Sequence, residues 1–432
     1  MFFSKDPKKK VRERRKKRPT SLNITQTHLQ KIPASELAPG MFVAELDIPW
    51  EDSPFLFQGF KLETWEDVDS VIACSQEVTI DVQQTEKIRI PRHDPNATGF
   101  VSSTHMRKAG TVKEMKQASK SYNHASKLVT SMMDDIRLGK AIDTQGAKQV
   151  VSEAVDSIIR TPDAMMMLTT IKNRDEYTAE HSLNVAVLTI AFGRALGLER
   201  ERLEELGVCG LLHDMGKVLT PDEVLLKEGR LSDKEFQIMK KHPTNGRDII
   251  SSSGGNFPGA MDVAHSHHER IDGHGYPRGL YEHQMTLWSK IVSITDAFDA
   301  ITSDRCYQDA RTNMDAFRIM NKVRGKQFDS NLVMRFIGSI GIYPAGTIVQ
   351  LNSGESGVVI EANPKSSLQP KVMVIRDPLG GVIPPKLIDL TEKITVPGSD
   401  REYYKITTML KKSQTDIDML ELKEKGFLLD EI

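Results

Sequence analysis

Eight of the twelve histidines of this chain lie between residues 181 and 283. Two of them, His267 and His268, are adjacent, and another, His213, directly precedes Asp214. Histidine is the commonest metal ligand and the side chain whose charge changes nearest to neutral pH. Adjacent His-His and His-Asp pairs are poor choices for an ordinary solvated helix face. The cluster therefore indicates metal chemistry.

Most of the candidate ligands are predicted to lie at helix ends. His213 and Asp214 close an apolar helix that Gly216 should stop, and His242 precedes a proline, which marks a helix boundary. Side chains at helix ends can point into one cavity while the helix bodies fill the core. The predicted metal ligands are His181, His213, Asp214, His242, His267, His268 and Asp296.

Asp296 is predicted to lie inside an apolar helix, at residues 291–301. Burial of an unpaired carboxylate there would destabilise the fold by roughly several kcal/mol, and a metal or a basic partner would remove that penalty. Of the remaining histidines in the cluster, His265, His274 and His283 are not expected to be ligands.

The donors are five histidines and two aspartates, without a thiolate. Such a set suits Fe, Mn, Co, Ni or Zn and disfavours Cu(I) and structural zinc. Seven ligands are too many for one catalytic ion that keeps an open position, so two ions are expected, with Asp214 as the bridge. A two-metal site activates a bridging hydroxide and neutralises phosphoryl oxygens, which indicates phosphoester hydrolysis. Lys217, one turn after Asp214, is a candidate phosphate contact.

The order and spacing of these motifs resemble the HD-GYP family, a bacterial branch of the HD metal-dependent phosphohydrolases. The resemblance covers roughly residues 150–342, and the preceding unit resembles an uncharacterised domain that often precedes HD-GYP domains. The residues that carry it are His213-Asp214, Gly216-Lys217, His242-Pro243, His267-His268-Glu269, Gly275-Tyr276-Pro277 and Asp296.

The resemblance implies hydrolysis of a cyclic dinucleotide, chiefly cyclic di-GMP, to the linear dinucleotide or to mononucleotides. It assigns one metal to His181, His213, Asp214 and Asp296, and the second to Asp214, His242, His267 and His268. Iron or manganese is the favoured metal, with nickel, cobalt and zinc as alternatives.

The resemblance also implies roles around the metals. Lys217 and Arg305 would contact phosphate, and Asp299 would orient the site, so that Asp214, Lys217 and Asp299 form the predicted catalytic set. Glu269 and Arg270 would buttress the adjoining loop. The residues of that loop predicted to shape the substrate pocket are Gly273, Gly275, Tyr276 and Pro277.

Three positions depart from the family pattern. Some relatives carry a glutamate four residues before the first histidine, where it helps to bind a third metal, and Tyr177 stands there in this chain. Two metals are therefore favoured. Cys306 and Ser330 each replace a common proline, which affects local loop geometry but removes no ligand.

Other functions stay open at this stage. The substrate could be 3'3'-cyclic GMP-AMP, or the chain could be a non-catalytic cyclic-dinucleotide sensor, although such degenerate relatives are expected to lack a ligand. A mononucleotide hydrolase of the general HD type would need only four of these ligands. A nucleic-acid binder would rest on the basic tail alone, which has no interleaved aromatic residues for base stacking, so no DNA partner is expected.

The bulk composition fits a soluble protein of two or three domains, at about 150 residues per domain. The 432 residues are 39% hydrophobic and 27% charged, with a net charge of −1. No apolar run approaches the roughly 20 residues of a transmembrane helix. The start lacks a secretory signal and the three cysteines are widely spaced, so a cytoplasmic location is expected.

The predicted fold is multidomain: a small α+β N-terminal domain, an all-α HD-type helical bundle and a small β-rich C-terminal module. The flanking units are expected to support a homodimer or a signalling partner. The predicted segments are a basic disordered tail (1–20), the α+β domain (21–95), a linker with a connecting helix (96–145), the catalytic helical domain (146–342), the β module (343–395) and a polar tail (396–432).

Overall fold

The computed structural model describes residues 28–48, 59–62, 65–82, 85, 111–171, 177–254, 257–303, 311–363, 366–399 and 401–424. The chain divides into two compact units, Met1–Ala97 and Thr98–Ile432. The predictions of a basic tail at 1–20 and of a phosphate contact at Arg305 concern residues outside these described ranges.

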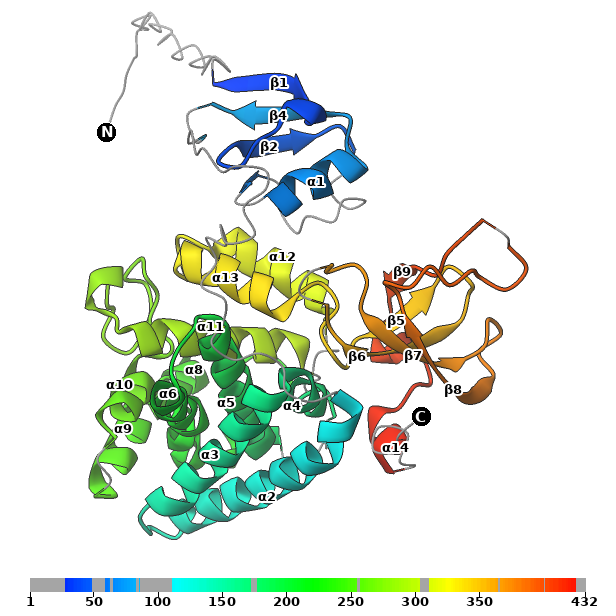
Figure 1. The fold of residues 1–432 in the computed structure, drawn as a ribbon. Helices are drawn as coiled ribbons and strands as arrows, with labels where there is room; N and C mark the ends of the chain where they lie inside the picture. Colours follow the sequence, from blue (N-terminus) through cyan, green and yellow to red (C-terminus); the bar gives the residue numbers. More distant parts are fainter. Residues whose placement is uncertain are drawn as a thin grey trace, which may run out of the picture. The chain divides into compact units, whose positions relative to one another are not determined.

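The first unit is a four-stranded antiparallel sheet with one helix (Figure 1). Apolar residues alternate along the last strand, so Val78 and Ile80 face a core to which the helix contributes Val68 and Val71. The prediction of a small α+β domain is confirmed. Its elements are β1 (Leu29–Pro33), η1 (Ala34–Glu36), β2 (Phe42–Leu46), β3 (Phe60–Lys61), α1 (Trp65–Cys74) and β4 (Glu77–Asp81), with strand order β1-β4-β2-β3.

The second unit begins with a helical bundle, which confirms the predicted all-α domain (Figure 1). Its long helices are α2 (Thr111–Arg137), α3 (Thr144–Arg160), α5 (Tyr177–Ala195), α6 (Arg200–Leu212), α9 (His242–Ser252), α10 (Pro258–Ser266), α11 (Leu287–Thr302), α12 (Asn313–Val323) and α13 (Ser330–Ile340). The short helical elements are α4 (Pro162–Leu168), η3 (Met215–Leu219), α7 (Asp222–Leu225), α8 (Asp233–Met239) and η4 (Glu282–Gln284).

Helix α5 is the central helix of this bundle. It packs against α2, α3, α6 and α11, and every residue from 179 to 190 is buried. A helix that is buried all round has no solvent for its polar side chains, so each of them needs a partner inside the protein. His181 and Asn184 are two such residues. The functional site is built where their partners lie.

The C-terminal part of the second unit is a five-stranded antiparallel sheet with its own apolar core (Figure 1). The strands are β5 (Ile348–Leu351), β6 (Ser356–Glu361), β7 (Lys371–Arg376), β8 (Val382–Asp389) and β9 (Ile406–Met409), in the order β8-β7-β6-β5-β9. The predicted β-rich module is therefore confirmed.

The segment after residue 395 differs from the polar tail that the sequence suggested. Strand β9 pairs with β5, and Val396 and Tyr404 belong to the core of the sheet. A further 3-10 helix and helix follow, η5 (Lys412–Gln414) and α14 (Met419–Glu424). The strand has only four residues, two of them threonines, and its pairing with β5 makes it the edge strand of the sheet.

None of the helices in the described part of the chain has the length and hydrophobicity needed to cross a membrane.

Candidate metal centre

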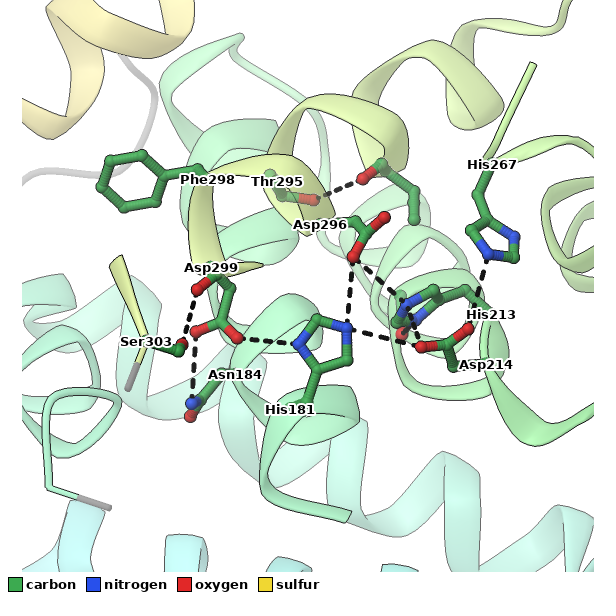
Figure 2. A network of polar contacts seen from close by, with 12 residues as sticks. His181, Asn184, His213, Asp214, His267, Thr295, Asp296, Phe298, Asp299 and Ser303 are labelled. Carbon is green, nitrogen blue, oxygen red and sulfur yellow. Dashed lines mark hydrogen bonds and ion pairs between the residues drawn. The ribbon is translucent and has the colours of Figure 1, made fainter. Parts of the chain in front are cut away.

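Asp214 stands at the centre of the histidine cluster, and its two carboxylate oxygens face different histidines (Figure 2). Oδ2 lies 3.4 Å from Nε2 of His181 and 3.3 Å from Nε2 of His213. Oδ1 lies 3.3 Å from Nε2 of His242 and 3.5 Å from Nε2 of His267. Each oxygen of this carboxylate therefore lies near a different pair of histidine rings.

The seven predicted ligands form two groups, and within each group the donor atoms lie within 4.8 Å of one another. We call them the α5 group (His181, His213 and Asp296) and the α9 group (Asp214, His242, His267 and His268). All are buried except His268, which is partly exposed. The structure thus brings together side chains from three long helices, α5, α9 and α11, and from the segments that follow α6 and α10.

The ring orientation of three histidines is set by their own backbone. Nδ1 of His213 lies 2.7 Å from the carbonyl oxygen of Gly210, and Nδ1 of His242 lies 2.7 Å from that of Met239. Nδ1 of His267 makes the same kind of contact within α10, at 3.0 Å. A carbonyl oxygen can only accept, so these Nδ1 atoms carry the proton, and Nε2 is the ring nitrogen left to face a metal.

His181 is oriented by a side chain instead. Its Nδ1 donates to Oδ2 of Asp299 at 2.7 Å, while its Nε2 lies 3.2 Å from Oδ1 of Asp296 (Figure 2). A carboxylate that holds the far nitrogen of a metal-binding histidine fixes the tautomer and the ring direction. Asp299 lies where a residue that orients the site would be expected.

The donor atoms fit divalent cations. Nε2 of His242 and Nε2 of His267 are 3.3 Å apart, although both are acceptors in rings whose Nδ1 is protonated. Among the described residues, Nε2 of His213 and Oδ1 of Asp214 have no hydrogen-bond partner. Unpaired buried acceptors are costly, and a cation satisfies several of them at once. Ligands held at about 2.0–2.2 Å from one ion lie about 3 to 3.5 Å from each other, as these atoms do.

Burial and neighbouring charges shift the pKa values of the site residues in opposite directions. Burial lowers the pKa of His242 to about 3 and holds that of His268 well below its usual value. Burial also disfavours a charged His181, but three carboxylates, led by Asp214, outweigh it and raise the pKa of His181 to about 10. Burial raises the pKa of Asp214, yet the ammonium group of Lys217 brings it well below its usual range. The cluster therefore keeps its carboxylates ionised.

Gly216 allows the two halves of the site to approach. A Cβ atom at this position would lie 2.0 Å from the carbonyl oxygen of His242 and 2.4 Å from the backbone nitrogen of Gly246. The start of η3 therefore packs directly on the start of α9, which brings Asp214 beside His242. Lys217, in the same element, forms an ion pair with Asp214. The predicted phosphate contact thus lies against the cluster.

A cavity of about 320 Å³ adjoins the cluster. His267, His268 and Asp296 form one side of it, and Gly275 and Tyr276 of the loop form another. The ring of Tyr276 lies over that of His268, with centroids 4.8 Å apart. Gly273 and Pro277, which were predicted to shape the same pocket, are not among the described residues that line it.

The side chain of Glu269 holds the loop that carries Tyr276. The buried carboxylate of Glu269 accepts hydrogen bonds from the backbone nitrogens of Arg278 (2.6 Å) and Leu280 (3.0 Å). A Cβ atom on Gly275 would lie 2.4 Å from the Cα atom of Glu269, so no larger residue fits without moving the loop. The predicted buttressing role of Glu269 is confirmed.

Of the three positions that depart from the family pattern, the structure describes the surroundings of Ser330 only. Tyr177 is the first residue of α5, and its side chain lies outside what is described, as does the whole of Cys306. Ser330 is the first residue of α13, whose start is capped by the side chain of Asp329. That cap accepts two backbone N–H groups, so the helix begins there without a proline.

Sequence reasoning missed two sets of residues near the site. Phe236, within α8, and Lys240, just after it, line the cavity near Tyr276. No motif marks them. Asn184, on α5, donates to Asp299, and its position three residues after His181 on a helix was the available signal.

Models of three known families match successive parts of the chain. An HD domain matches residues 165–332, a domain of unknown function (DUF3391) matches residues 29–147, and a KOW domain associated with HD domains matches residues 348–396. The fold and the site thus define an HD-domain hydrolase with two accessory modules.

Several characterised proteins are similar to this chain. It is 37% identical to the cyclic di-GMP phosphodiesterase PA4108 of Pseudomonas aeruginosa over 371 residues, 84% of this chain and 89% of that protein. A cyclic di-GMP phosphodiesterase of Thermotoga maritima is 36% identical, covering 44% of this chain and 52% of that protein. The 3'3'-cGAMP-specific phosphodiesterase 1 of Vibrio cholerae is 37% identical, covering 37% and 36%. The chain belongs to the HD-GYP family of phosphodiesterases.

Proposed function

We propose that this protein hydrolyses cyclic di-GMP, to the linear dinucleotide or to GMP, at a centre of two divalent cations. The observation that carries the proposal is the division of seven donors, six of them buried, into two groups that both contact Asp214. The similarity to PA4108 along most of both chains supports the choice of substrate.

The α5 group and Oδ2 of Asp214 would hold one cation, and His242, His267, His268 and Oδ1 of Asp214 the other. Iron or manganese is favoured for this all-nitrogen and oxygen set, with nickel, cobalt and zinc as alternatives. When bound, such a pair would activate water as the nucleophile and would neutralise charge on the phosphoryl oxygens.

The protein's own residues would bind and orient the diester. Lys217 already faces Asp214 and would offer its charge to a phosphate once the carboxylate is shared with cations. Arg305 is proposed as a second phosphate contact. Tyr276 and Phe236, whose rings are 6.1 Å apart, offer apolar faces to a nucleobase at the cavity. Asp299 would keep Nε2 of His181 directed at the site.

A second substrate, 3'3'-cyclic GMP-AMP, is favoured by one observation. The Vibrio cholerae enzyme that is specific for this nucleotide is 37% identical over 161 residues, and the Thermotoga maritima cyclic di-GMP enzyme is 36% identical over 195 residues. The residues around Tyr276 do not distinguish guanine from adenine, because stacking on an aromatic ring tolerates either base. A non-catalytic sensor is disfavoured, because all seven donors are in place.

The proposal also covers the cellular location of the enzyme and the role of its flanking modules. A cytoplasmic location is supported by Cys74 and Cys209, which are unpaired thiols. The modules at either end of the HD domain would serve dimerisation or a signalling partner.

The test is to load purified protein with manganese or iron, add cyclic di-GMP or 3'3'-cyclic GMP-AMP, and separate the products over time. Release of linear dinucleotide or GMP from cyclic di-GMP, faster than from the mixed nucleotide, is expected. A His213→Ala, Asp214→Ala variant should be inactive and hold less metal. His283→Ala, which removes a histidine outside both groups, serves as the control. Protein that holds two metals and cleaves neither nucleotide would refute the proposal.

A further inference from the structure

We propose that Tyr122 and Asn184 are positioning residues of the metal centre, so that helix α2 completes the catalytic site. This inference rests on the proposed metal-dependent function. Residues 29–147 match the domain of unknown function, and this range includes α2, whereas Asn184 belongs to the HD domain. The contact between them therefore gives the C-terminal part of the uncharacterised segment a task in the neighbouring domain.

A chain of buried side chains joins α2 to the cluster. The hydroxyl of Tyr122 donates to Oδ1 of Asn184 at 2.7 Å, and Nδ2 of Asn184 donates to Oδ1 of Asp299 at 3.3 Å. The other oxygen of Asp299 accepts from Nδ1 of His181 at 2.7 Å, and Nε2 of His181 faces Asp214 and Asp296. Figure 2 shows the part of this chain from Asn184 to Asp214.

The tyrosine hydroxyl determines which way the asparagine amide points. Asn184 has one acceptor and two donors, and its amide nitrogen also faces the backbone oxygen of Thr169 at 3.4 Å. Since Tyr122 donates to the amide oxygen, the NH₂ group is turned toward Asp299. Reversal of the amide would place its oxygen against the Asp299 carboxylate, where two acceptors repel. Tyr122 thus holds Asn184 in the orientation that anchors Asp299.

Helix α2 is held firmly in the helical bundle, so it can position Asn184. Its buried residues recur at helical spacing, and Tyr122 itself is only 5% exposed. Near its start, the buried carboxylate of Glu114 binds the guanidinium of Arg160 on α3 with two hydrogen bonds of 2.9 and 2.7 Å. Ser157 of α3 donates to the same carboxylate. Bidentate pairs of this kind specify orientation, so the register of α2 along the bundle is set.

The consequence differs between the two groups of donors. His213, His242 and His267 are held by backbone carbonyls three residues earlier in the chain, so the hydrogen-bond chain from α2 reaches only His181. Loss of the chain should therefore weaken one metal site and spare the other. A merely structural role of Tyr122 would loosen the bundle and weaken both sites together.

The experiment is a titration of metal-free, full-length protein with Mn²⁺, with binding measured by calorimetry. Variants His181→Ala and His268→Ala identify which binding step belongs to which group. Tyr122→Phe should weaken the α5-group step about fivefold, as expected for one buried hydrogen bond. Asn184→Asp keeps the acceptor for Tyr122 but turns a carboxylate toward Asp299, and a loss of about 10- to 100-fold is expected at the same step.

Tyr404→Phe is the matched control, because Tyr404 is a buried tyrosine in the core of the β module. It should leave both binding steps unchanged, and thermal unfolding checks that every variant is folded. Unchanged Mn²⁺ affinity in folded Tyr122→Phe and Asn184→Asp, or equal weakening of both steps, would overturn the inference. Wild-type protein that binds no Mn²⁺ would contradict the proposed function as well, whereas binding without hydrolysis would contradict the proposed function alone.

Discussion

The two groups of donors around Asp214 are built in different ways. The α9 group comes from helix ends, its hydrogen-bonded rings are held by carbonyls three or four residues away, and two of its histidines line the cavity. The α5 group draws His181 and Asp296 from within buried helices, and His181 depends on Asp299, which is 118 residues away in sequence. The hydrogen-bonded rings of the α9 group are thus oriented locally. In the α5 group, His213 is also oriented locally, whereas His181 depends on a tertiary contact.

This difference has a thermodynamic consequence. A histidine held by a carbonyl three residues earlier keeps its orientation whenever that short stretch of chain folds. A histidine held by a distant carboxylate keeps its orientation only if both helices are correctly packed, because the partner is positioned by packing. The α5 group should therefore be the more sensitive of the two to substitutions of side chains that touch no metal.

The largest effect is expected where the two groups meet. Asp214→Asn replaces the shared carboxylate by an amide, which removes a negative charge and one oxygen donor from the centre. Both cations should be lost or bound weakly, and hydrolysis should fall by about 10³-fold or more, since metals contribute several kcal/mol to such reactions. Metal content by mass spectrometry and a hydrolysis assay measure the two effects.

The equivalent change at Asp248 is a suitable control for Asp214→Asn, because Asp248 is exposed and pairs with its neighbour Arg247. Asp248→Asn should leave metal content and activity as in the wild type. An Asp214→Asn protein that retains two metals and full activity would remove the basis for treating the groups as one centre.

An intermediate effect, confined to one group, is expected for Asp299→Asn. The amide keeps the size of the side chain but turns the strong acceptor of the His181 Nδ1–H into a weaker one. Affinity for the α5-group cation should fall about 10- to 100-fold, with the α9-group site unchanged. A titration with Mn²⁺ resolves the two steps, and equal weakening of both would argue against the separate construction of the groups.

The smallest effect is expected at the cavity. Gly275→Ala places a methyl group against the backbone of Glu269 and Arg270, so the loop that carries Tyr276 must shift. The KM for cyclic di-GMP should rise by about 10-fold, a loss of binding worth roughly 1.4 kcal/mol, while both metals stay bound. Gly338→Ala, where a Cβ atom meets nothing within 4 Å, is the control. Loss of metal in Gly275→Ala would show that the loop belongs to the cluster rather than to the cavity.

The sequence was sufficient to predict the seven donors and the helices that carry them. His213 and His267 end apolar helices, and Asp296 stands in an apolar stripe, so each position was visible from local pattern alone. The family resemblance implied the same two groups that the distances now define, although metal ligation itself stays a prediction.

Other features depend on contacts that no local pattern encodes. The link from Tyr122 through Asn184 to Asp299 joins residues far apart in sequence, and it becomes visible only when α2, α5 and α11 are packed. Phe236 lies in a short helix whose residues look like an ordinary exposed surface, yet packing places it at the cavity. Strand β9 has only four residues, and its place is set by pairing with β5 and by packing of Ile406 on the core of the sheet.

The central claim is that Asp214 joins two metal sites. Anomalous diffraction from crystals of the manganese-loaded protein tests it most directly. We predict two anomalous peaks, one among His181, His213 and Asp296 and the other among His242, His267 and His268, with a carboxylate oxygen of Asp214 beside each. A single peak in fully loaded protein, or two peaks of which one lies away from Asp214, would contradict this account.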